Sequence, residues 1–262
     1  MAIVKNVFDY LCEIAPINVK SEKDNIGLLV GRGDTDVSKI ILALDITSDV
    51  ISEANNKGAN LIVSHHPLFF SLNSITDSDV TGKRILQLIE NGISAICMHT
   101  NLDAAPDGVN CVLAKAVGIV DPKPLNESTQ NSDSGFSFGR VGFLKAPCNM
   151  AEYLQKLKTA LKTDRLRYYD AGRYVHKVAV AGGSGTAEFE RMLENGCDTF
   201  VTGDIKYNFF LEAKELGINL IDGGHFCTEN IIIPPLADKL RTKFPQVDVF
   251  VSESHKETVK FC

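Results

Sequence analysis

The sequence predicts an α/β protein made of two similar lobes. Apolar runs of strand length, such as residues 39–45 and 60–63, alternate along the chain with segments of helical periodicity. This alternation is typical of mostly parallel sheets with helices on their faces. The second half of the chain also repeats the order of elements found in the first half. We therefore expect an internal duplication that places one lobe in each half.

The composition is that of a globular protein and excludes several other classes. Of the 262 residues, 44% are hydrophobic and 23% charged, as in ordinary folded domains. The net charge of −6 disfavours electrostatic attraction to nucleic acid or to an anionic membrane surface. No apolar run approaches the roughly 20 residues of a membrane span. The seven cysteines form no Cys-x-x-Cys pair, so we expect reduced thiols in a cytoplasmic protein.

In the first lobe, residues 1–126, predicted strands alternate with predicted helices. Residues 1–16 have the apolar spacing of an amphipathic helix, and a polar turn then leads into a short strand that ends at Gly31. The strand at 39–45 precedes a helix at 47–57, with Thr47 or Ser48 as its N-cap and Gly58 at its end. After the strand at 60–63 and a polar loop at 71–80, a helix ending at Gly92 precedes a strand at 93–98. A last helix begins at Asp107 or Asn110.

Residues 127–138 are predicted to link this lobe to the second, residues 139–262. Residues 39–66 align with 177–204 without a gap, and this alignment places His65-His66 on Gly203-Asp204. A smaller offset then places residues 99–103 on 225–229. Few aligned residues are identical, so chance similarity of two α/β units remains the alternative to duplication.

Two adjacent histidines, His65 and His66, follow the strand at 60–63. Ligands of α/β proteins bind at the carboxyl ends of strands. Adjacent side chains of a regular strand point to opposite faces. Both rings can therefore reach one site only if the backbone bends, and Pro67 favours such a bend. The alternatives are a metal site, or one packed and one solvated histidine.

Two further strands are each followed by a histidine and, four residues later, by a carboxylate. These pairs are His99 with Asp103 and His225 with Glu229. Imidazole and carboxylate ligands suit borderline divalent ions such as Zn, Fe, Mn, Co or Ni. Because carboxylates can bridge two ions, five or six such ligands favour a dinuclear centre. The alternative is that both carboxylates only cap helices and that both histidines are satisfied locally.

Three other features have a structural and a functional interpretation. The glycine-rich turn at residues 182–185 either binds phosphate or simply allows a tight connection between a strand and a helix. Lys206 either meets an anionic substrate or is solvated. Cys227 is a packed small residue rather than a nucleophile.

Several motifs, in this order, resemble the NIF-three-like family, whose members are called GTP cyclohydrolase I type 2 homologues. They are Ser-His-His-Pro, His-Thr-Asn-Leu-Asp, Gly-Gly-Ser-Gly, Val-Thr-Gly-Asp-Ile-Lys-Tyr and Asn-Leu-Ile-Asp-Gly-Gly-His. The resemblance implies two similar α/β lobes, with two divalent metal ions between them, in a toroidal homohexamer. It implies five ligands: His65, His66, Asp103, His225 and Glu229. The short segment between the lobes implies the compact form without an inserted domain.

The resemblance also implies an activity, that of a metal-dependent hydrolase acting on a nucleotide. For GTP the reaction would open the imidazole ring of the purine at C8 and release formate. His99 would transfer protons or support the ligands, and Lys206 or Arg140 would bind the triphosphate. Lys23 and Asn208 depart from residues common in the family, which affects substrate contacts rather than the ligands. The alternative is a non-enzymatic protein that handles metal or acts as an adaptor, and no motif indicates nucleic-acid binding.

Overall fold

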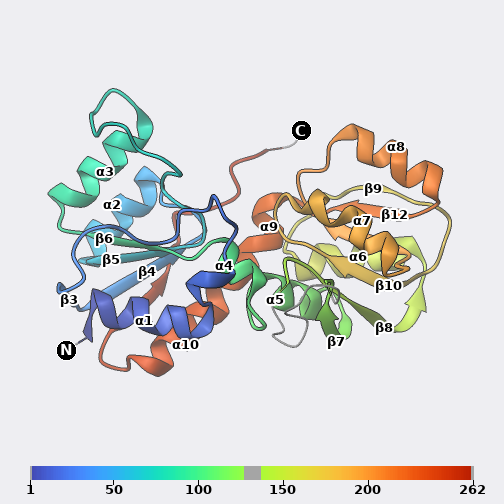
Figure 1. Cartoon of the computed structure of the whole chain (residues 1–262), viewed down its shortest axis with the longest axis horizontal. Coiled ribbons are helices and arrows are strands. Elements are labelled where there is room, and N and C mark those ends of the chain that lie inside the picture. Colours follow the sequence, from blue (N-terminus) through green and yellow to red (C-terminus); the bar gives the residue numbers. More distant parts are fainter. Residues whose placement is uncertain (1, 127–136, 261–262) are drawn as a thin grey trace. The chain divides into compact units, whose positions relative to one another are not determined.

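The computed structural model describes residues 2–126 and 137–260, and the chain forms two compact units (Figure 1). Unit 1 comprises Met1–Leu102 and Ile233–Cys262, and unit 2 comprises Asp103–Ile232. These boundaries differ from those expected at residues 126 and 139, because the last strand of the chain returns to pair with a strand of unit 1. Most of the predicted linker at 127–138 lies outside the described residues.

Unit 1 is built on a five-stranded sheet of order β13-β4-β5-β6-β2. Its strands are β2 (Gly27–Val30), β4 (Lys39–Ala43), β5 (Leu61–Ser64), β6 (Ser94–Cys97) and β13 (Asp248–Val251), with β1 (Ala2–Ile3) and β3 (Asp36–Val37) forming a separate pair. All neighbours in the five-stranded sheet are parallel except β2 and β6. The expectation of a mostly parallel sheet is confirmed for this unit.

Helices cover both faces of this sheet (Figure 1). They are α1 (Val4–Ile14), α2 (Ser48–Lys57), α3 (Val80–Glu90) and α10 (Ile233–Lys243). Alternate strand residues such as Ile41 and Ile62 pack against Val50 of α2 and Leu88 of α3, while α1 and α10 lie on the other face. The predicted cap of α2 is confirmed, because Thr47 Oγ1 accepts from the amide of Val50 at 3.2 Å.

The C-terminal segment of unit 1 is held by the carboxylate of Glu53 on α2. This carboxylate accepts from Ser252 Oγ at 2.6 Å, from the amide of Glu253 at 3.1 Å and from the amide of Ser254 at 3.0 Å. Burial alone would raise the pKa of Glu53, but these hydrogen bonds outweigh it and lower the pKa to about 2. Glu53 therefore attaches residues 252–254 to α2 as an ionised group.

Unit 2 is built on a six-stranded sheet of order β7-β8-β10-β11-β12-β9. The strands are β7 (Ile119–Pro124), β8 (Arg140–Cys148), β9 (Arg167–Tyr169), β10 (Val175–Val180), β11 (Thr199–Thr202) and β12 (Asn219–Asp222). Only β10, β11 and β12 run parallel, and the other neighbours are antiparallel. The expectation of a mostly parallel sheet is wrong here, since β7, β8 and β9 are antiparallel additions around a parallel centre.

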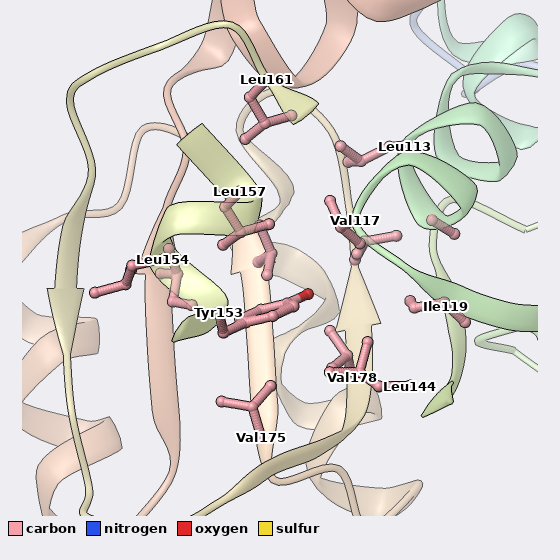
Figure 2. Packing of buried hydrophobic residues seen from close by; sticks show 14 of the residues in the cluster. Leu113, Val117, Ile119, Leu144, Tyr153, Leu154, Leu157, Leu161, Val175 and Val178 are labelled. Atoms are coloured by element: carbon pink, nitrogen blue, oxygen red, sulfur yellow. The ribbon is translucent and has the colours of Figure 1, made fainter. Parts of the chain in front are cut away.

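The helices of unit 2 bury a core on each face of this sheet. They are α5 (Val109–Ala116), α6 (Met150–Ala160), α7 (Phe189–Glu194), α8 (Tyr207–Leu216) and α9 (His225–Glu229), while α4 (Thr100–Ala104) contains the boundary between the units. One core joins strand residues such as Val178 to α5 and α6 (Figure 2). The other joins Ala179 and Phe200 to α7 and α8. Neighbouring residues of β10 thus face different cores, as the period of a strand requires.

Tyr153 of α6 lies at the centre of the first of these cores. Its ring is fully buried among aliphatic side chains that include Leu157 and Val178 (Figure 2). Its hydroxyl is buried as well and has no hydrogen-bond partner among the described residues. Burial strongly raises the pKa of this hydroxyl. Tyr153 therefore contributes apolar packing rather than chemistry.

Within residues 2–126 and 137–260, the structure has no helix with the length and apolarity that a membrane crossing requires.

Candidate metal centre

The chain bends immediately after β5, and the bend brings His65 and His66 together. The two ring centroids are 5.0 Å apart, whereas a regular strand would send the side chains to opposite faces. Ser64 Oγ donates to the carbonyl of His66 at 2.8 Å, and the amide of His66 donates to Leu44 O at 2.8 Å. These bonds fix the bend beside the end of β4. The predicted convergence of the two rings is confirmed.

His99, which follows β6, joins this pair. Its ring centroid lies 5.2 Å from that of His65 and 5.6 Å from that of His66. Each of the three rings offers one nitrogen, and these nitrogens all lie within 4.8 Å of one another. Three imidazoles at the ends of adjacent parallel strands therefore form a compact cluster within unit 1.

An oxygen atom holds Nδ1 of each ring in this cluster. The acceptor is Met98 O for His65 at 2.9 Å, Asp45 Oδ1 for His66 at 2.8 Å and Asp24 Oδ1 for His99 at 2.8 Å. A carbonyl or carboxylate oxygen only accepts, so Nδ1 carries the proton and the lone pair lies on Nε2. This is the tautomer and support found for histidines that bind metal through Nε2.

The two carboxylates that hold His66 and His99 are themselves stabilised as anions. Burial alone would raise the pKa of Asp24, but hydrogen bonds from His99 and from the hydroxyl and amide of Thr100 outweigh it and lower the pKa strongly. Burial alone would also raise the pKa of Asp45, but hydrogen bonds from His255 and His66 outweigh it and lower the pKa strongly. Both side chains are therefore charged acceptors at neutral pH.

Unit 2 presents a second set of ligand-type side chains around α9. His225 begins this helix directly after β12, and its Nδ1 lies 2.7 Å from Asp204 Oδ2. Its Nε2 lies 2.9 Å from Oε2 of the buried Glu229, one helical turn later. The spacing of four residues thus places both side chains on the same face of a helix. Two ligands of one ion, each about 2.0–2.2 Å from it, can have such a separation.

Asp103 lies near Glu229 in the same unit. One carboxylate oxygen of Asp103 and one of Glu229 are within 4.8 Å of each other. The backbone carbonyl of Asp103 accepts from Asn110 Nδ2 at 3.1 Å, and Asn110 Oδ1 accepts from the amide of Gly182 at 2.7 Å. The buried Asn110 therefore ties the segment that carries Asp103 to the end of β10.

The glycine-rich turn at 182–185 is explained by this close packing. Gly183 has φ +61°, and a Cβ at this position would lie 2.0 Å from Glu229 Oε1. A Cβ at Gly203 would lie 2.8 Å from the amide nitrogen of His225. The glycines thus let the ends of β10 and β11 approach α9. The helical start after the turn is a short 3-10 segment, η3 (Gly185–Glu188), and the geometry favours the tight-turn interpretation over phosphate binding.

The two residues expected to bind substrate have different environments. Arg140 is 2% exposed, and its guanidinium donates to the carbonyls of Ser137, Gly139, Ala104 and Ala105 at 2.7–3.2 Å. These bonds join the start of β8 to the segment after α4, which is a structural role. Lys206 is exposed at the N-cap of α8, and its contact with substrate stays a prediction.

The donor set in each unit fits a divalent metal ion. Unit 1 supplies three imidazoles with Nδ1 held, and unit 2 supplies one imidazole and two carboxylates. Neutral nitrogen and anionic oxygen donors of this kind are those that Zn, Fe, Mn, Co and Ni accept. The sequence did not reveal Asp24, Asp45, Asp204 or His255 as supporting residues. Of these residues, Asp204 is the one that the repeat aligns with His66.

Comparisons with known proteins agree on one family. Residues 2–258 match the family described as Duf34/NIF3 (NGG1p interacting factor 3). A Clostridium perfringens protein named GTP cyclohydrolase 1 type 2 homolog is 34% identical over 261 residues, covering 98% of this chain and 99% of that protein. A crystal structure of a Staphylococcus aureus protein has a TM-score of 0.91 at 27% identity and covers 99% of both chains. A Bacillus cereus protein related to NIF3 has the same fold, with a TM-score of 0.90 at 22% identity, over 100% of this chain and 99% of that one. The chain therefore belongs to the Duf34/NIF3 family.

Proposed function

We propose that this protein is a metal-dependent hydrolase that acts on a nucleotide. The observation that carries the proposal is the cluster of His65, His66 and His99, in which every Nδ1 is held by an oxygen and one nitrogen of each ring lies within 4.8 Å of the others. For His65 and His66 this arrangement directs Nε2 to a metal ion, and for His99 it directs Nε2 to a reacting group beside the ion.

Five side chains bind the metal in this proposal: His65, His66, Asp103, His225 and Glu229. The histidines supply nitrogen donors, and the carboxylates of Asp103 and Glu229 supply oxygen donors that can bridge two ions. We propose two ions per chain. His99 stays outside the ligand set and acts next to it.

When bound, the metal ions would lower the pKa of a water molecule and make a nucleophile available at neutral pH. The chain's own residues orient this site. Asp24 holds the ring of His99 with its proton on Nδ1, so that Nε2 can accept a proton from a reacting group. Asp45 fixes His66, and Asp204 fixes His225.

The nucleotide substrate is proposed on the name of the relatives. The Clostridium perfringens protein carries the name GTP cyclohydrolase 1 type 2 homolog. For GTP the reaction is hydrolytic attack on C8 of the purine, opening of the five-membered ring and release of formate. Lys206, exposed at the start of α8, is the remaining candidate for binding the triphosphate.

The proposal is tested by metal content and turnover on the same samples. Wild type, His65→Ala, Glu229→Ala and the control His176→Ala are purified under metal-replete conditions and analysed for Zn, Fe, Mn, Co and Ni. His176 is a histidine of β10 that packs against Phe143 and belongs to neither ligand set. Each sample is then incubated with GTP and a panel of nucleotides and phosphoesters.

We expect about two ions per chain in wild type and His176→Ala, with metal and turnover lost together in the two ligand variants. His99→Gln separates the two classes of function, because in a hydrolase it abolishes turnover and leaves metal content intact. Bound metal without turnover on any substrate would favour a protein that stores or delivers metal. Wild type without metal would refute both functions.

A further inference from the structure

A large aromatic ring lies in solvent beside the histidine cluster. Phe70 is 64% exposed, and its ring centroid is 6.0 Å from that of His99, with the two ring planes at 64°. Single exposed apolar residues are common on protein surfaces and by themselves indicate nothing. Its position next to His99 and the way its backbone is held distinguish this ring.

The backbone before Phe70 is fixed by the segment that also fixes His99. Asn25 Nδ2 donates to the carbonyl of Phe69 at 2.7 Å, and the neighbouring Asp24 accepts from His99 Nδ1. The side chain of Phe69 packs against the core of unit 1. Residues 24 and 25 therefore set the positions of the His99 ring and of the peptide that leads to Phe70.

We infer that Phe70 is the surface on which the planar base of the substrate stacks, so that the site selects nucleotides over phosphoesters that lack a base. This inference rests on the proposed function. Every nucleobase has a π-face, and stacking on an aromatic side chain contributes strongly to binding. A ring presented at the edge of the cluster would hold the base next to His99, the residue proposed to move protons.

The chain contains no tryptophan, which allows a direct optical test. Phe70→Trp places a single indole beside His99, and Ile89→Trp places one on α3 in the same unit, where Ile89 is 57% exposed. Emission of each variant is followed during titration with Co²⁺ alone, then with GTP, and then with inorganic triphosphate as a ligand without a base. We expect Co²⁺ and GTP to quench the indole at position 70, triphosphate to leave it unchanged, and none of the three to affect the indole at position 89.

Binding of GTP to Phe70→Ala, Phe70→Leu and Phe70→Tyr supplies the second measurement. We expect Phe70→Ala and Phe70→Leu to bind GTP about 5- to 150-fold more weakly, which is the 1–3 kcal/mol of one stacked base at 1.4 kcal/mol per decade. Phe70→Tyr should bind as wild type does, and all three variants should retain metal. Triphosphate should bind all variants equally.

The outcomes separate this inference from the proposed function. Quenching at position 70 by Co²⁺ but not by GTP, together with unaltered GTP binding by Phe70→Ala, would overturn the stacking role and leave the metal site in place. Absence of any response to Co²⁺ and GTP would overturn both. A blue-shifted emission at position 70 that returns to the red on dilution would show that another copy of the protein covers the ring, and this also overturns the inference.

Discussion

Replacement of Gly183 by alanine tests whether the turn after β10 is shaped by the carboxylate of Glu229. The residue has φ +61°, a conformation that costs a residue with a Cβ about 1–2 kcal/mol. The new Cβ would also lie 2.0 Å from Glu229 Oε1, 2.8 Å from its Cδ and 3.2 Å from His225 Nε2. Glu229 is 4% exposed, so its side chain has little room to move away.

The chain offers a matched control in the same unit. Gly196 has φ +65°, and a Cβ there would meet nothing within 4 Å. Gly196→Ala should therefore cost only the backbone energy, about 1 kcal/mol. Gly183→Ala adds overpacking, which typically costs 1–3 kcal/mol, and should lose roughly 2–4 kcal/mol in all.

Urea unfolding of the metal-free proteins measures the packing cost without the contribution of bound metal. Elemental analysis of the metal-loaded proteins measures the effect on the proposed site. We expect Gly183→Ala to lose metal and Gly196→Ala to retain it. Equal unfolding free energies for the two variants, with wild-type metal content in both, would refute the conclusion that Gly183 is required because Glu229 packs against it.

Three further predictions concern single side chains. At pH values above 4.5, the ordinary pKa of a glutamate, ionised Glu53 stabilises unit 1, and this contribution is lost as the pH falls from about 4.5 to about 2. The difference in unfolding free energy between wild type and Glu53→Gln, measured by urea titration, should therefore be on the order of 2–3 kcal/mol at pH 7 and vanish near pH 2. A difference that does not change with pH would contradict this. Tyr153→Phe removes a buried hydroxyl that has no hydrogen-bond partner among the described residues. We expect the unfolding free energy of this variant to equal that of wild type or to exceed it by about 1 kcal/mol. A decrease of about 1 kcal/mol would show that the hydroxyl is hydrogen-bonded. Asp45→Asn removes the charge that holds the proposed ligand His66, and we expect metal affinity in a chelator competition to fall about 10- to 100-fold, with the surface variant Asp9→Asn unchanged; equal affinities would contradict a supporting role.

The strands and helices that position the site could be predicted from local patterns. The apolar run before His65 predicts a strand from residues close in sequence, and β5 confirms it. The spacing of four residues between His225 and Glu229 singled out this pair, and α9 shows that the two residues lie one helical turn apart. Whether neighbouring strands run parallel or antiparallel was harder to predict from the sequence. An apolar strand has the same pattern whether its neighbours are parallel or antiparallel, so the antiparallel placement of β8 and β9 could not be inferred.

The supporting residues and the unit boundary were missed because they depend on distant partners. Asp24 meets His99 across 75 residues, and His255 meets Asp45 across 210. The pairing of β13 with β4 likewise joins the end of the chain to its first third. For Arg140 the sequence shows only a cation between glycine and apolar residues, while the fold surrounds it with four carbonyl oxygens. No local pattern contains this information.

The four histidines of the candidate centre share one arrangement, which explains why the supporting residues matter. Each Nδ1 lies against an oxygen supplied by the same unit: Met98 O, Asp45, Asp24 or Asp204. Each unit therefore orients its own rings through its own fold, before any ion is bound. Because rings oriented in advance lose little freedom on binding, part of the metal affinity resides in residues that never touch the ion. Replacing Asp45 or Asp204 should therefore weaken metal binding even though every proposed ligand remains in place.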